Sequence, residues 1–472
     1  MKWVLADHDA GAVSELSRQT GIPNLIARLL AVRGITDPSV VRSFLSSDLS
    51  SLSDPRLFRD MDRAVSRIKE AIIRKERIFV YGDYDVDGVT GSAVLVLGLR
   101  ELGADVESYI PDRMTEGYGL NSASMQAIHA AGTRLVITVD CGISAFQEAQ
   151  LVRNLGIDLI ITDHHEISGL NDVKESNGLP LPDALVVLHP ALLVPAATAE
   201  ERERVGVLTG VGVAFKLVQA IRGSAGHDPE LVKFLDLVTL GTVADMGKIT
   251  GENRVMVKEG LAMMSSDSAN QRPGVEALKQ VAGLVGKRVT VGTVGFSLAP
   301  RINASGRLEK ADKAFRLIIS KDPEEALRIA RELDEVNRER QDVEERIWTE
   351  ARKHCLNMDM EKTGAIILAS KEWHPGVVGI VASRIAEEFY RPAVLIALKD
   401  GVGKGSARSI PGFDLYHGLS RCSDLLLGFG GHKYAAGLSI AEDKIPLLKE
   451  RFGNLVLEEF QETGFERSIT ID

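Results

Sequence analysis

The 472-residue sequence contains few cysteines and no long apolar segment. Its three cysteines, Cys141, Cys355 and Cys422, lie far apart, so we expect neither a disulfide framework nor a zinc knuckle, and we expect a reducing, cytoplasmic location. No run of about 18 apolar residues appears, and residues 1–9 lack the apolar core of a signal peptide. These absences argue against a secreted disulfide-rich domain and predict no association with a membrane.

A basic excess is also missing, because the formal net charge is −10 at pH 7. Phosphate-binding proteins usually carry more basic than acidic residues, so this charge is weak evidence against nucleic-acid binding. Part of the acidic excess lies in a cluster of carboxylates described below, which bound cations would offset. The content of 44% hydrophobic and 26% charged residues is otherwise that of an ordinary soluble protein, long enough for several domains.

Periodicity divides the chain into five segments. We expect a helical segment at 1–75, alternating strands and helices at 76–320, a long connecting helix at 321–357, a smaller α/β domain at 358–464, and a short strand at 465–472. The expected helices before residue 320 are Ile22–Arg33, Ser39–Leu49, Met61–Arg74, Gly91–Leu102, Ser122–Ala131, Ser144–Leu155 and Val207–Ile221.

The connecting helix contains no glycine and has charged flanks on both sides of an apolar stripe. This pattern suits a solvated surface helix or a bridge between two domains. We favour the bridge because a second α/β pattern follows at once, with strands at Ala365–Ala369 and Ala393–Leu398 and a helix at Val377–Tyr390. We expect the glycine-containing segments 401–408 and 428–432 to be loops of this domain.

Metal-seeking side chains stand at the ends of four apolar runs that resemble buried strands. Ile78–Tyr81 is followed by Asp83, Asp85 and Asp87, and Leu135–Val139 is followed by Asp140. Leu159–Thr162 is followed by Asp163, His164 and His165, and Leu237–Val243 is followed by Asp245. Open parallel sheets bind ligands beyond the carboxyl ends of their strands. So many carboxylates in one crevice would repel one another, and a bound cation is the usual resolution. The sequence therefore predicts a polynuclear metal site.

The first acidic segment, 82–88, places aspartates at every second position between two glycines. In an extended backbone Asp83, Asp85 and Asp87 would project from one face. A solvated acidic turn and a calcium loop are the alternatives. The EF-hand loop is disfavoured because position 94 is Val where a Glu ligand is needed, and because a strand rather than a helix precedes the segment.

Adjacent histidines follow Asp163, and their side chains point in different directions. One can therefore bind metal while the other faces substrate, and Asp163 can orient an imidazole. Carboxylate-rich ligation with one imidazole and no thiolate suits Mn²⁺ or Mg²⁺ better than zinc or copper. Asp140 is placed to bridge two ions, which would stabilise the attacking and leaving oxygens of a phosphoryl transfer.

These motifs resemble the DHH phosphoesterase superfamily, and within it the bacterial 5′→3′ exonucleases specific for single-stranded DNA. The resemblance covers nearly the whole chain. Its motifs are at 82–88, 139–142, 163–165, 243–246, 110–119, 300–307, 337–341 and 373–384, and the segments at 406–408 and 430–432 resemble the DHHA1 domain of that family. The implied fold is α/β, with a parallel-sheet DHH domain joined by the long helix to a smaller DHHA1 domain.

The resemblance implies a role for each motif. Asp83, Asp85, Asp87, Asp140, His164 and Asp245 would form the shell of two Mn²⁺ or Mg²⁺ ions, and the catalytic residues would be Asp140, Asp163 and His165, with His165 facing the scissile phosphate. His189 departs from the usual Asn before Pro190, and we expect it to be structural. The DNA contacts would be Arg113, Tyr118, Arg307, Arg384, Ser406, Arg408, Gly430, Gly431 and His432.

The implied function is a metal-dependent exonuclease that releases 5′-mononucleotides from single-stranded DNA in repair and recombination. The alternatives are a phosphodiesterase for short oligonucleotides or cyclic dinucleotides, and a replication scaffold that has lost its metals. The scaffold fits poorly, since none of the metal-seeking residues is missing. Single-strand-binding protein and a helicase are partners by resemblance alone, and residues 467–472 resemble the first strand of an oligonucleotide-binding barrel.

Overall fold

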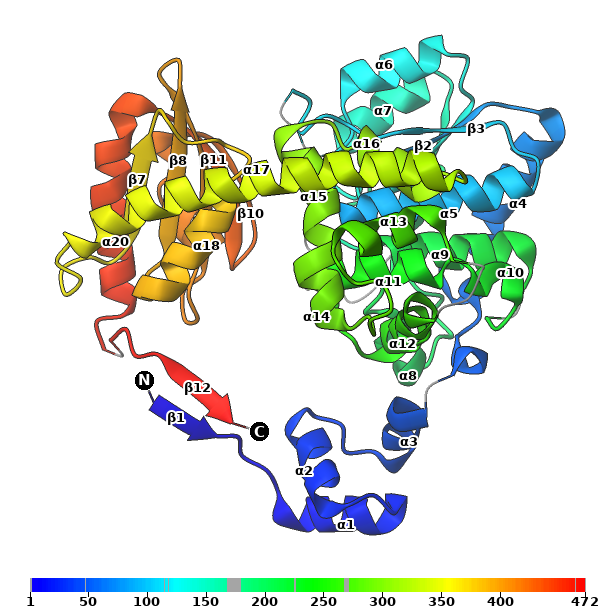
Figure 1. Ribbon diagram of the computed structural model, residues 1–472, viewed down its shortest axis with the longest axis horizontal. Coiled ribbons are helices and arrows are strands. Elements are labelled where there is room, and N and C mark those ends of the chain that lie inside the picture. Colours follow the sequence, from blue (N-terminus) through cyan, green and yellow to red (C-terminus); the bar gives the residue numbers. More distant parts are fainter. Residues whose placement is uncertain are drawn as a thin grey trace. The chain divides into compact units, whose positions relative to one another are not determined.

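The computed structural model describes residues 2–46, 48–113, 115–117, 119–167, 180–224, 226–266, 271–462 and 464–471. The chain forms two compact units (Figure 1), one comprising residues 37–337 and the other residues 1–36 with 338–472. The division falls inside the long helix α17 (Pro323–Leu356), whose 34 residues lie within the segment 321–357 where a connecting helix is expected. The five segment boundaries drawn from the sequence stay a prediction.

A five-stranded parallel sheet forms the centre of the 37–337 unit. Its strands are β2 (Ile78–Gly82), β3 (Val106–Tyr109), β4 (Leu135–Val139), β5 (Asp158–Thr162) and β6 (Val186–Leu188). The spatial order is β3-β2-β4-β5-β6, and every neighbouring pair is parallel. The order reverses at β2 and β4, so the crevice beyond their carboxyl ends is the usual place for a ligand in such a sheet.

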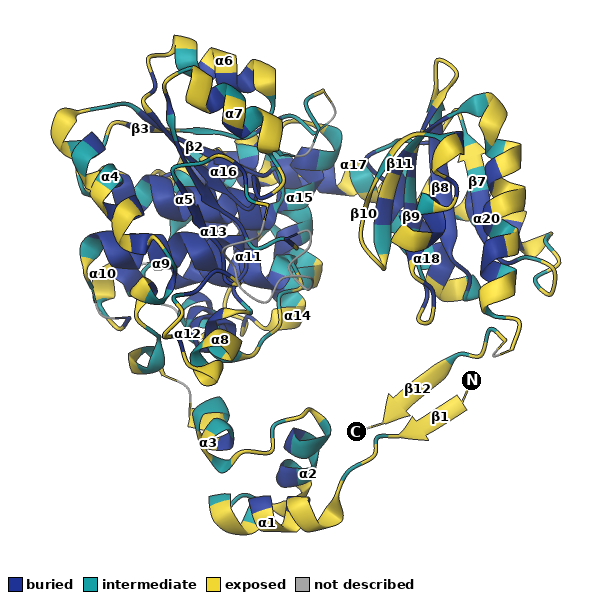
Figure 2. Ribbon diagram, turned by 180° about the vertical axis from the view of Figure 1, so that it is seen from behind, coloured by how far each residue is buried: buried dark blue, intermediate teal, exposed yellow. Residues whose placement is uncertain are grey.

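Helices cover both faces of this sheet because both faces are apolar. In β2, Ile78 and Val80 belong to the larger core, whereas Phe79 and Tyr81 point into a smaller one, as the alternation of side chains along a strand requires. The larger core includes α4 (Met61–Arg74), α5 (Val86–Glu101) and α9 (Gly210–Arg222), and the smaller includes α6 (Ser122–Ala130) and α7 (Phe146–Asn154). Figure 2 shows this buried interior between exposed outer helix faces.

The fourth apolar run is a helix, not the strand expected from the sequence. Residues Leu235–Ala244 form α11, which is buried on every side between α5 and α12 (Gly251–Ser265). A fully buried helix and a fully buried strand share a continuous apolar pattern, so periodicity cannot separate them. Gly241 and Gly260 mark the close packing, because an added Cβ at Gly260 would stand 2.2 Å from the carbonyl oxygen of Leu235.

The other helical elements of this unit complete the covering layers. They are α3 (Pro38–Ser46), η1 (Leu49–Ser51), η2 (Pro55–Leu57), α8 (Ala199–Val205), α10 (Pro229–Val232), α13 (Pro273–Val281), α14 (Val291–Thr293), the π-helical turn η5 (Val294–Leu298), α15 (Ala299–Leu308) and α16 (Asp312–Ile319). No single described helix is long and apolar enough to cross a membrane, and α8 with α9 would reach that length only as a pair bent by 115°.

A second mixed sheet forms the core of the other unit. Its order is β10-β11-β9-β8-β7, in which only β7 and β8 are parallel. The elements are β7 (Ile366–Ser370), α18 (Val378–Phe389), β8 (Ala393–Lys399), β9 (Val402–Arg408), α19 (Leu415–Ser420), η6 (Ser423–Leu425), β10 (Leu426–Gly431), β11 (Ala435–Ala441), η7 (Glu442–Lys444) and α20 (Ile445–Glu459). The expected strands at 365–369 and 393–398 and the helix at 377–390 are confirmed.

The glycine-containing segments of this unit are strands rather than the loops expected. Residues 402–408 are the central strand β9, and 426–431 are the edge strand β10. Glycine in a strand often marks close packing. Gly403 and Gly405 have this role, because added Cβ atoms would stand 2.5 Å from Ile396 and 2.9 Å from Leu438.

The amino-terminal residues form a small separate sheet and two helices. Strand β1 (Lys2–Leu5) pairs in parallel with β12 (Ser468–Ile471), and α1 (Ala10–Thr20) packs on α2 (Asn24–Val32). The expectation that residues 1–75 are helical therefore missed β1, while the expected strand near 467–472 is confirmed. Whether a barrel continues from β12 stays a prediction.

Candidate metal centre and nucleic-acid interface

The first acidic segment is a strand-to-helix turn and not an extended chain. Asp83 follows β2, Asp85 is the N-cap of α5 and accepts hydrogen bonds from the backbone N–H groups of Asp87 and Gly88, and Asp87 already lies in the first helical turn. The expected alternation of three side chains on one face is therefore wrong. An added Cβ at Gly88 would stand 2.5 Å from the backbone of Asp83, so only glycine permits this tight turn.

Asp87 joins α5 to the start of α9. Its carboxylate accepts hydrogen bonds from the backbone N–H groups of Gly210 (2.6 Å) and Val211 (2.9 Å) and from the hydroxyl of Thr209 (3.2 Å). A helix N-terminus favours negative charge, so these hydrogen bonds oppose the rise in the pKa of Asp87 that burial causes. The contact fixes Asp87 within reach of His164 and Asp245.

Asp140 follows β4 in a left-handed backbone conformation with φ of 62°, which is rare for a residue other than glycine. Strain of this kind concentrates at functional sites. Its carboxylate is buried, with one oxygen 3.0 Å from Nε2 of His164. An added Cβ at Gly210 would stand 2.6 Å from Cβ of Asp140, so α9 begins against the centre of the cluster.

His164 faces carboxylates from three different elements. Its Nε2 lies 3.0 Å from Asp140 and 3.7 Å from both Asp87 and Asp245. Asp245 caps the carboxyl end of α11, so a helix rather than a strand delivers it to the site. Burial, with the neighbouring His165, lowers the pKa of His164 to about 4, which leaves a neutral imidazole fit to ligate a cation.

The carboxylates themselves disfavour ionisation in the absence of a cation. Burial and then the neighbouring aspartates raise the pKa of Asp83, Asp87 and Asp140 well above the usual range, and burial with Asp85 raises that of Asp245 to about 7. One oxygen of Asp83 is buried and finds no hydrogen-bond donor among the described residues. Ligand atoms gather within 4.8 Å in three sets: Asp83 with Asp85 and Asp140, Asp87 with His164 and Asp245, and Asp140 with both histidines. Asp140 belongs to two of these sets, so the donors fit two oxygen-seeking divalent cations.

Asp163 holds the histidine segment rather than joining these ligands. It accepts hydrogen bonds from the backbone N–H groups of Ile143, His164 and His165 at 2.9, 2.7 and 3.1 Å, and from Nδ1 of His165 at 2.8 Å. Burial opposes both charges, but this ion pair lowers the pKa of Asp163 to about 2 and raises that of His165 to about 9. His165 is therefore a protonated donor with a side chain 42% exposed.

Comparison with known proteins gives the family. A model of the DHH family, N-terminal domain, matches residues 77–242, and one of the DHHA1 domain matches 362–458. The single-stranded-DNA-specific exonuclease RecJ of Escherichia coli is 36% identical over 456 residues, which cover 93% of this chain and 75% of that protein. The chain belongs to the RecJ family.

Two further RecJ relatives define the extent of the likeness. RecJ of Bacillus subtilis is 40% identical over 467 residues, and the chain spans about half of that relative's length, 56%. Crystal structures of Thermus thermophilus RecJ in complex with Mn²⁺ and with Mg²⁺ align with TM-scores of 0.80 and 0.74 at 33% and 32% identity. They cover the whole of this chain and 64% and 62% of those chains.

Arg113 and Arg307, expected from the RecJ resemblance to contact DNA, lie near the acidic turn. The guanidinium of Arg113 stacks over the ring of Tyr84, 5.1 Å from its centroid, and Tyr84 stands between Asp83 and Asp85. Arg307 is also close enough to act electrostatically on Tyr84. The neighbouring Gly306 packs on the same residue, because an added Cβ there would stand 2.8 Å from the carbonyl oxygen of Tyr84. Tyr118 lies outside the described residues.

The remaining expected DNA contacts belong to the other unit. Ser406 and Arg408 meet at Gly379 on α18, where an added Cβ would stand 3.2 and 3.3 Å from their polar atoms. Gly430 and Gly431 lie on the edge strand β10, and His432 follows it with an exposed side chain. Arg384 is more restrained, since it stacks on Trp348 at 4.2 Å and pairs with Glu344 and Glu345 of α17.

Sequence reasoning missed the residues that support the site. Asn303 on α15 accepts a hydrogen bond from the backbone N–H of Val86, and Glu116 accepts from Tyr109, Ser124 and the backbone of Asp112, which closes the segment carrying Arg113. His189 is structural as expected: Nδ1 accepts from the backbone of Ala191, so Nε2 donates to the carbonyl of His165 at 2.8 Å. Asn303 and Glu116 both lie in motifs of the sequence, but their hydrogen-bond partners lie from four to more than two hundred residues away along the chain.

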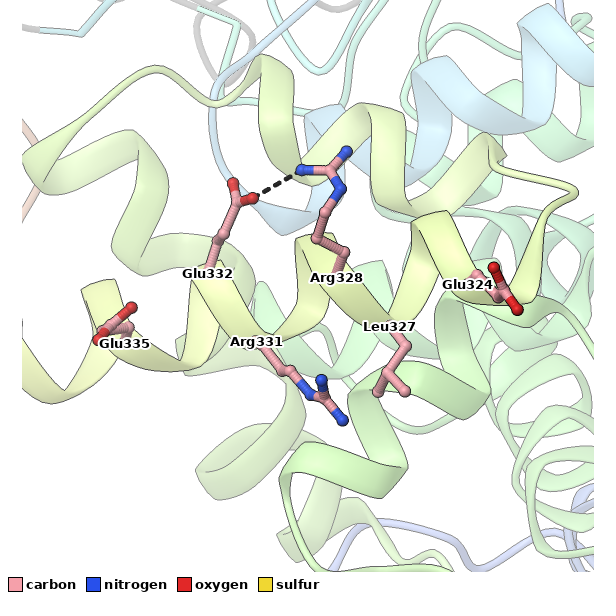
Figure 3. Close-up of a pocket in the computed structure, with 6 residues that line it drawn as sticks. All are labelled: Glu324, Leu327, Arg328, Arg331, Glu332 and Glu335. Atoms are coloured by element: carbon pink, nitrogen blue, oxygen red, sulfur yellow. Dashed lines mark hydrogen bonds and ion pairs between the residues drawn. The ribbon is translucent and has the colours of Figure 1, made fainter.

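A surface pocket of about 410 Å³ lies on α17 and is separate from these residues. It is lined by Glu324, Leu327, Arg328, Arg331, Glu332 and Glu335 (Figure 3). Arg328 already pairs with Glu332 at 2.7 Å, and the wall carries three glutamates against two arginines. The pocket therefore offers no excess of positive charge for a phosphate ligand.

Proposed function

We propose that this chain hydrolyses single-stranded DNA from the 5′ end and releases 5′-mononucleotides with the help of two Mn²⁺ or Mg²⁺ ions. The observation that carries the proposal is the convergence of six aspartate and histidine ligands around Asp140, with ligand atoms of His164 and Asp83 left for a cation. The named RecJ relatives are exonucleases specific for single-stranded DNA, and one has been seen with either metal.

The metal shell would comprise Asp83, Asp85, Asp87, Asp140, His164 and Asp245, with Asp140 shared between the ions. Two such ions supply a hydroxide nucleophile near neutral pH and offset the charge that develops on the phosphate. Asp87 is held by the start of α9 and Asp85 by the start of α5, so two helices fix the ligand positions before any ion arrives.

His165 would act on the scissile phosphate as a hydrogen-bond donor. Its Nδ1 is engaged by Asp163, and we propose that Nε2 faces a phosphate oxygen or the leaving oxygen. The ion pair with Asp163 keeps the ring protonated at neutral pH, and the carbonyl of His165 is held by His189. A positioned donor of this kind contributes about 10²–10⁴-fold to a rate.

Arginines would position the strand without reading its sequence. Arg113 would clamp a 5′-terminal phosphate, and Arg307, Ser406, Arg408, Gly430, Gly431 and His432 would contact the sugar-phosphate backbone. Arg384 would have to exchange its ion pairs with Glu344 and Glu345 for a phosphate. Tyr118 remains a proposed contact of the 5′ end. Cleavage should therefore depend little on base sequence.

The cellular setting rests on family resemblance alone. We propose that the chain acts in the cytoplasm in DNA repair and recombination, on single strands exposed by a helicase and coated by single-strand-binding protein.

Digestion of end-labelled oligonucleotides tests the proposal. With Mn²⁺, a 5′-labelled single strand should release labelled mononucleotide first, whereas a 3′-labelled strand should shorten progressively; chelator should stop both. Asp140→Asn should abolish turnover while the matched variant Asp105→Asn, at the opposite edge of the sheet, retains it. Equal digestion of blunt duplex, or a preference for dinucleotides and cyclic dinucleotides over long strands, would refute the assignment.

A further inference from the structure

Two large apolar side chains stand almost fully exposed beside the metal centre. Met246, which directly follows Asp245, is 90% exposed, and Phe296 is 89% exposed. Val291 in the neighbouring helix α14 is also exposed, by 42%. Exposed apolar groups at the rim of a polar site mark a binding surface more often than a packing defect.

Met246 also occupies a backbone conformation that suits glycine. Its φ is 57°, and α11 ends there with hydrogen bonds from the N–H of Met246 to Val243 and from that of Gly247 to Thr242. Glycine or asparagine is usual at such a helix end. Proteins keep such unfavourable backbone conformations mainly at functional sites, and Met246 lies next to a proposed metal ligand.

Phe296 is displayed by a π-helical turn that packs on the same helix end. The turn, Val294–Leu298, joins α14 to α15, and an added Cβ at Gly295 would stand 3.8 Å from Val243 (Figure 1 shows α14 and α15 beside α11). Such turns occur frequently at functional sites. Arg301 fixes the turn by donating to the carbonyl of Ser297 and pairing with Asp334 at 2.8 Å. Phe296 therefore projects from a rigid support.

The adjoining segment carries positive charge. Lys287 and Arg288 are exposed, and neither forms an ion pair within the part of the chain that the structure describes. Residues 285–296 include no Asp or Glu. Aromatic side chains beside unbalanced basic ones are the combination by which proteins hold single-stranded nucleic acid, with bases stacked and phosphates paired.

We propose that Met246 and Phe296 form a base-stacking subsite for the DNA strand, with Lys287 and Arg288 on its phosphates. This inference rests on the proposed nuclease function. Phe296 lies seven residues before Asn303, which touches the acidic turn, so the two are separated by about 10 Å along the helix. That distance corresponds to roughly three stacked nucleotides at ~3.4 Å each, so the subsite would hold bases beyond the one being released.

Binding and turnover of short oligonucleotides test this subsite. Because Phe296 is solvent-exposed, Phe296→Ala should fold normally, and it should raise the Kd for a labelled decanucleotide by about 10-fold or more, measured with chelator so that the strand is not cut. The KM ratio of variant to wild type should grow from dinucleotide to decanucleotide. In Phe296→Trp the indole emission should be quenched on DNA binding. Ile73→Ala, an exposed apolar change on α4, is the matched control and should behave as wild type.

The outcomes separate this subsite from the nuclease assignment. A Phe296→Ala variant with wild-type Kd and KM, in an enzyme that degrades DNA, would overturn the subsite alone. Unquenched indole emission in Phe296→Trp at saturating DNA would also overturn it. A wild-type protein that binds the decanucleotide but never cleaves it with Mn²⁺ or Mg²⁺ would instead overturn the proposed function, and the Kd comparison would still test Phe296.

Discussion

Replacing Asp163 with asparagine should weaken both the fold and the chemistry, by an amount that the contacts of this carboxylate define. One oxygen accepts from His164, from the backbone of His165 and from its Nδ1, and the other accepts from the backbone of Ile143. An amide can accept at only one of these positions. It should keep its oxygen on the side with three donors, which turns its NH₂ group toward the N–H of Ile143.

The expected loss of unfolding free energy has two parts. The buried N–H of Ile143 loses its acceptor, which costs about 1–3 kcal/mol. The ion pair with His165 is also lost, and because that side chain is 42% exposed, solvent screening limits its contribution to about 1 kcal/mol. The metal-free variant should therefore be less stable than the metal-free wild type by about 2–4 kcal/mol near neutral pH.

The pH dependence distinguishes these two parts. The pKa of His165 is raised from 6.5 to about 9, so the ion pair stabilises fully below pH 6.5 and its contribution is lost as pH rises through 9. Urea unfolding with chelator should show a wider gap between wild type and Asp163→Asn at pH 6 than at pH 10. With metal present, kcat should fall about 100-fold or more, and its alkaline limb should move to lower pH. A gap below 1 kcal/mol that is equal at both pH values would refute the reasoning.

Three other changes test separate contacts. Glu252→Gln should reduce the free energy of unfolding in urea by about 3–5 kcal/mol, because it leaves the fully buried Lys216 ammonium without its counter-ion. The double variant Lys216→Met with Glu252→Leu should lose far less, and equal losses would contradict this. Glu116→Ala should raise KM several-fold for 5′-phosphorylated strands but little for 5′-hydroxyl strands, because it frees the segment carrying Arg113; equal changes would contradict it. Wild-type protein with chelator should lose stability as pH rises from about 4 through 7, because Asp245 ionises over this range, and Mn²⁺ should remove that loss. Identical melting profiles with chelator and with Mn²⁺ would contradict this prediction.

Much of the metal centre is predictable because parallel strands deliver their following residues to one edge. The runs ending before Asp83, Asp140 and Asp163 are β2, β4 and β5, and their order in the sheet brings the three turns together. The long helix was equally plain, since its apolar stripe is uninterrupted by glycine over 34 residues. In both cases a local pattern and a general rule of topology suffice.

Other features depend on distant partners and could not be read locally. Asp245 reaches the cluster from the end of a helix and not from a strand. The sequence could not show this, because α11 is buried on every side and its residues follow no helical period. The close approach of Asp140 to α9 requires the glycine at position 210, about seventy residues beyond β4, and the backbone N–H of the same residue holds Asp87. The sequence predicts Arg384 as a phosphate ligand, whereas in the structure its guanidinium contacts Trp348 and the glutamates of α17.

The most direct test of the central claim is to locate metal in crystals soaked in Mn²⁺ by anomalous scattering. The account predicts two peaks about 3.5–4 Å apart, with Asp140 between them and His164 bound to one of them. Both peaks should disappear in Asp140→Asn crystals soaked in the same way. A single peak elsewhere on the surface, or none within reach of Asp83, Asp87 and Asp245, would contradict it.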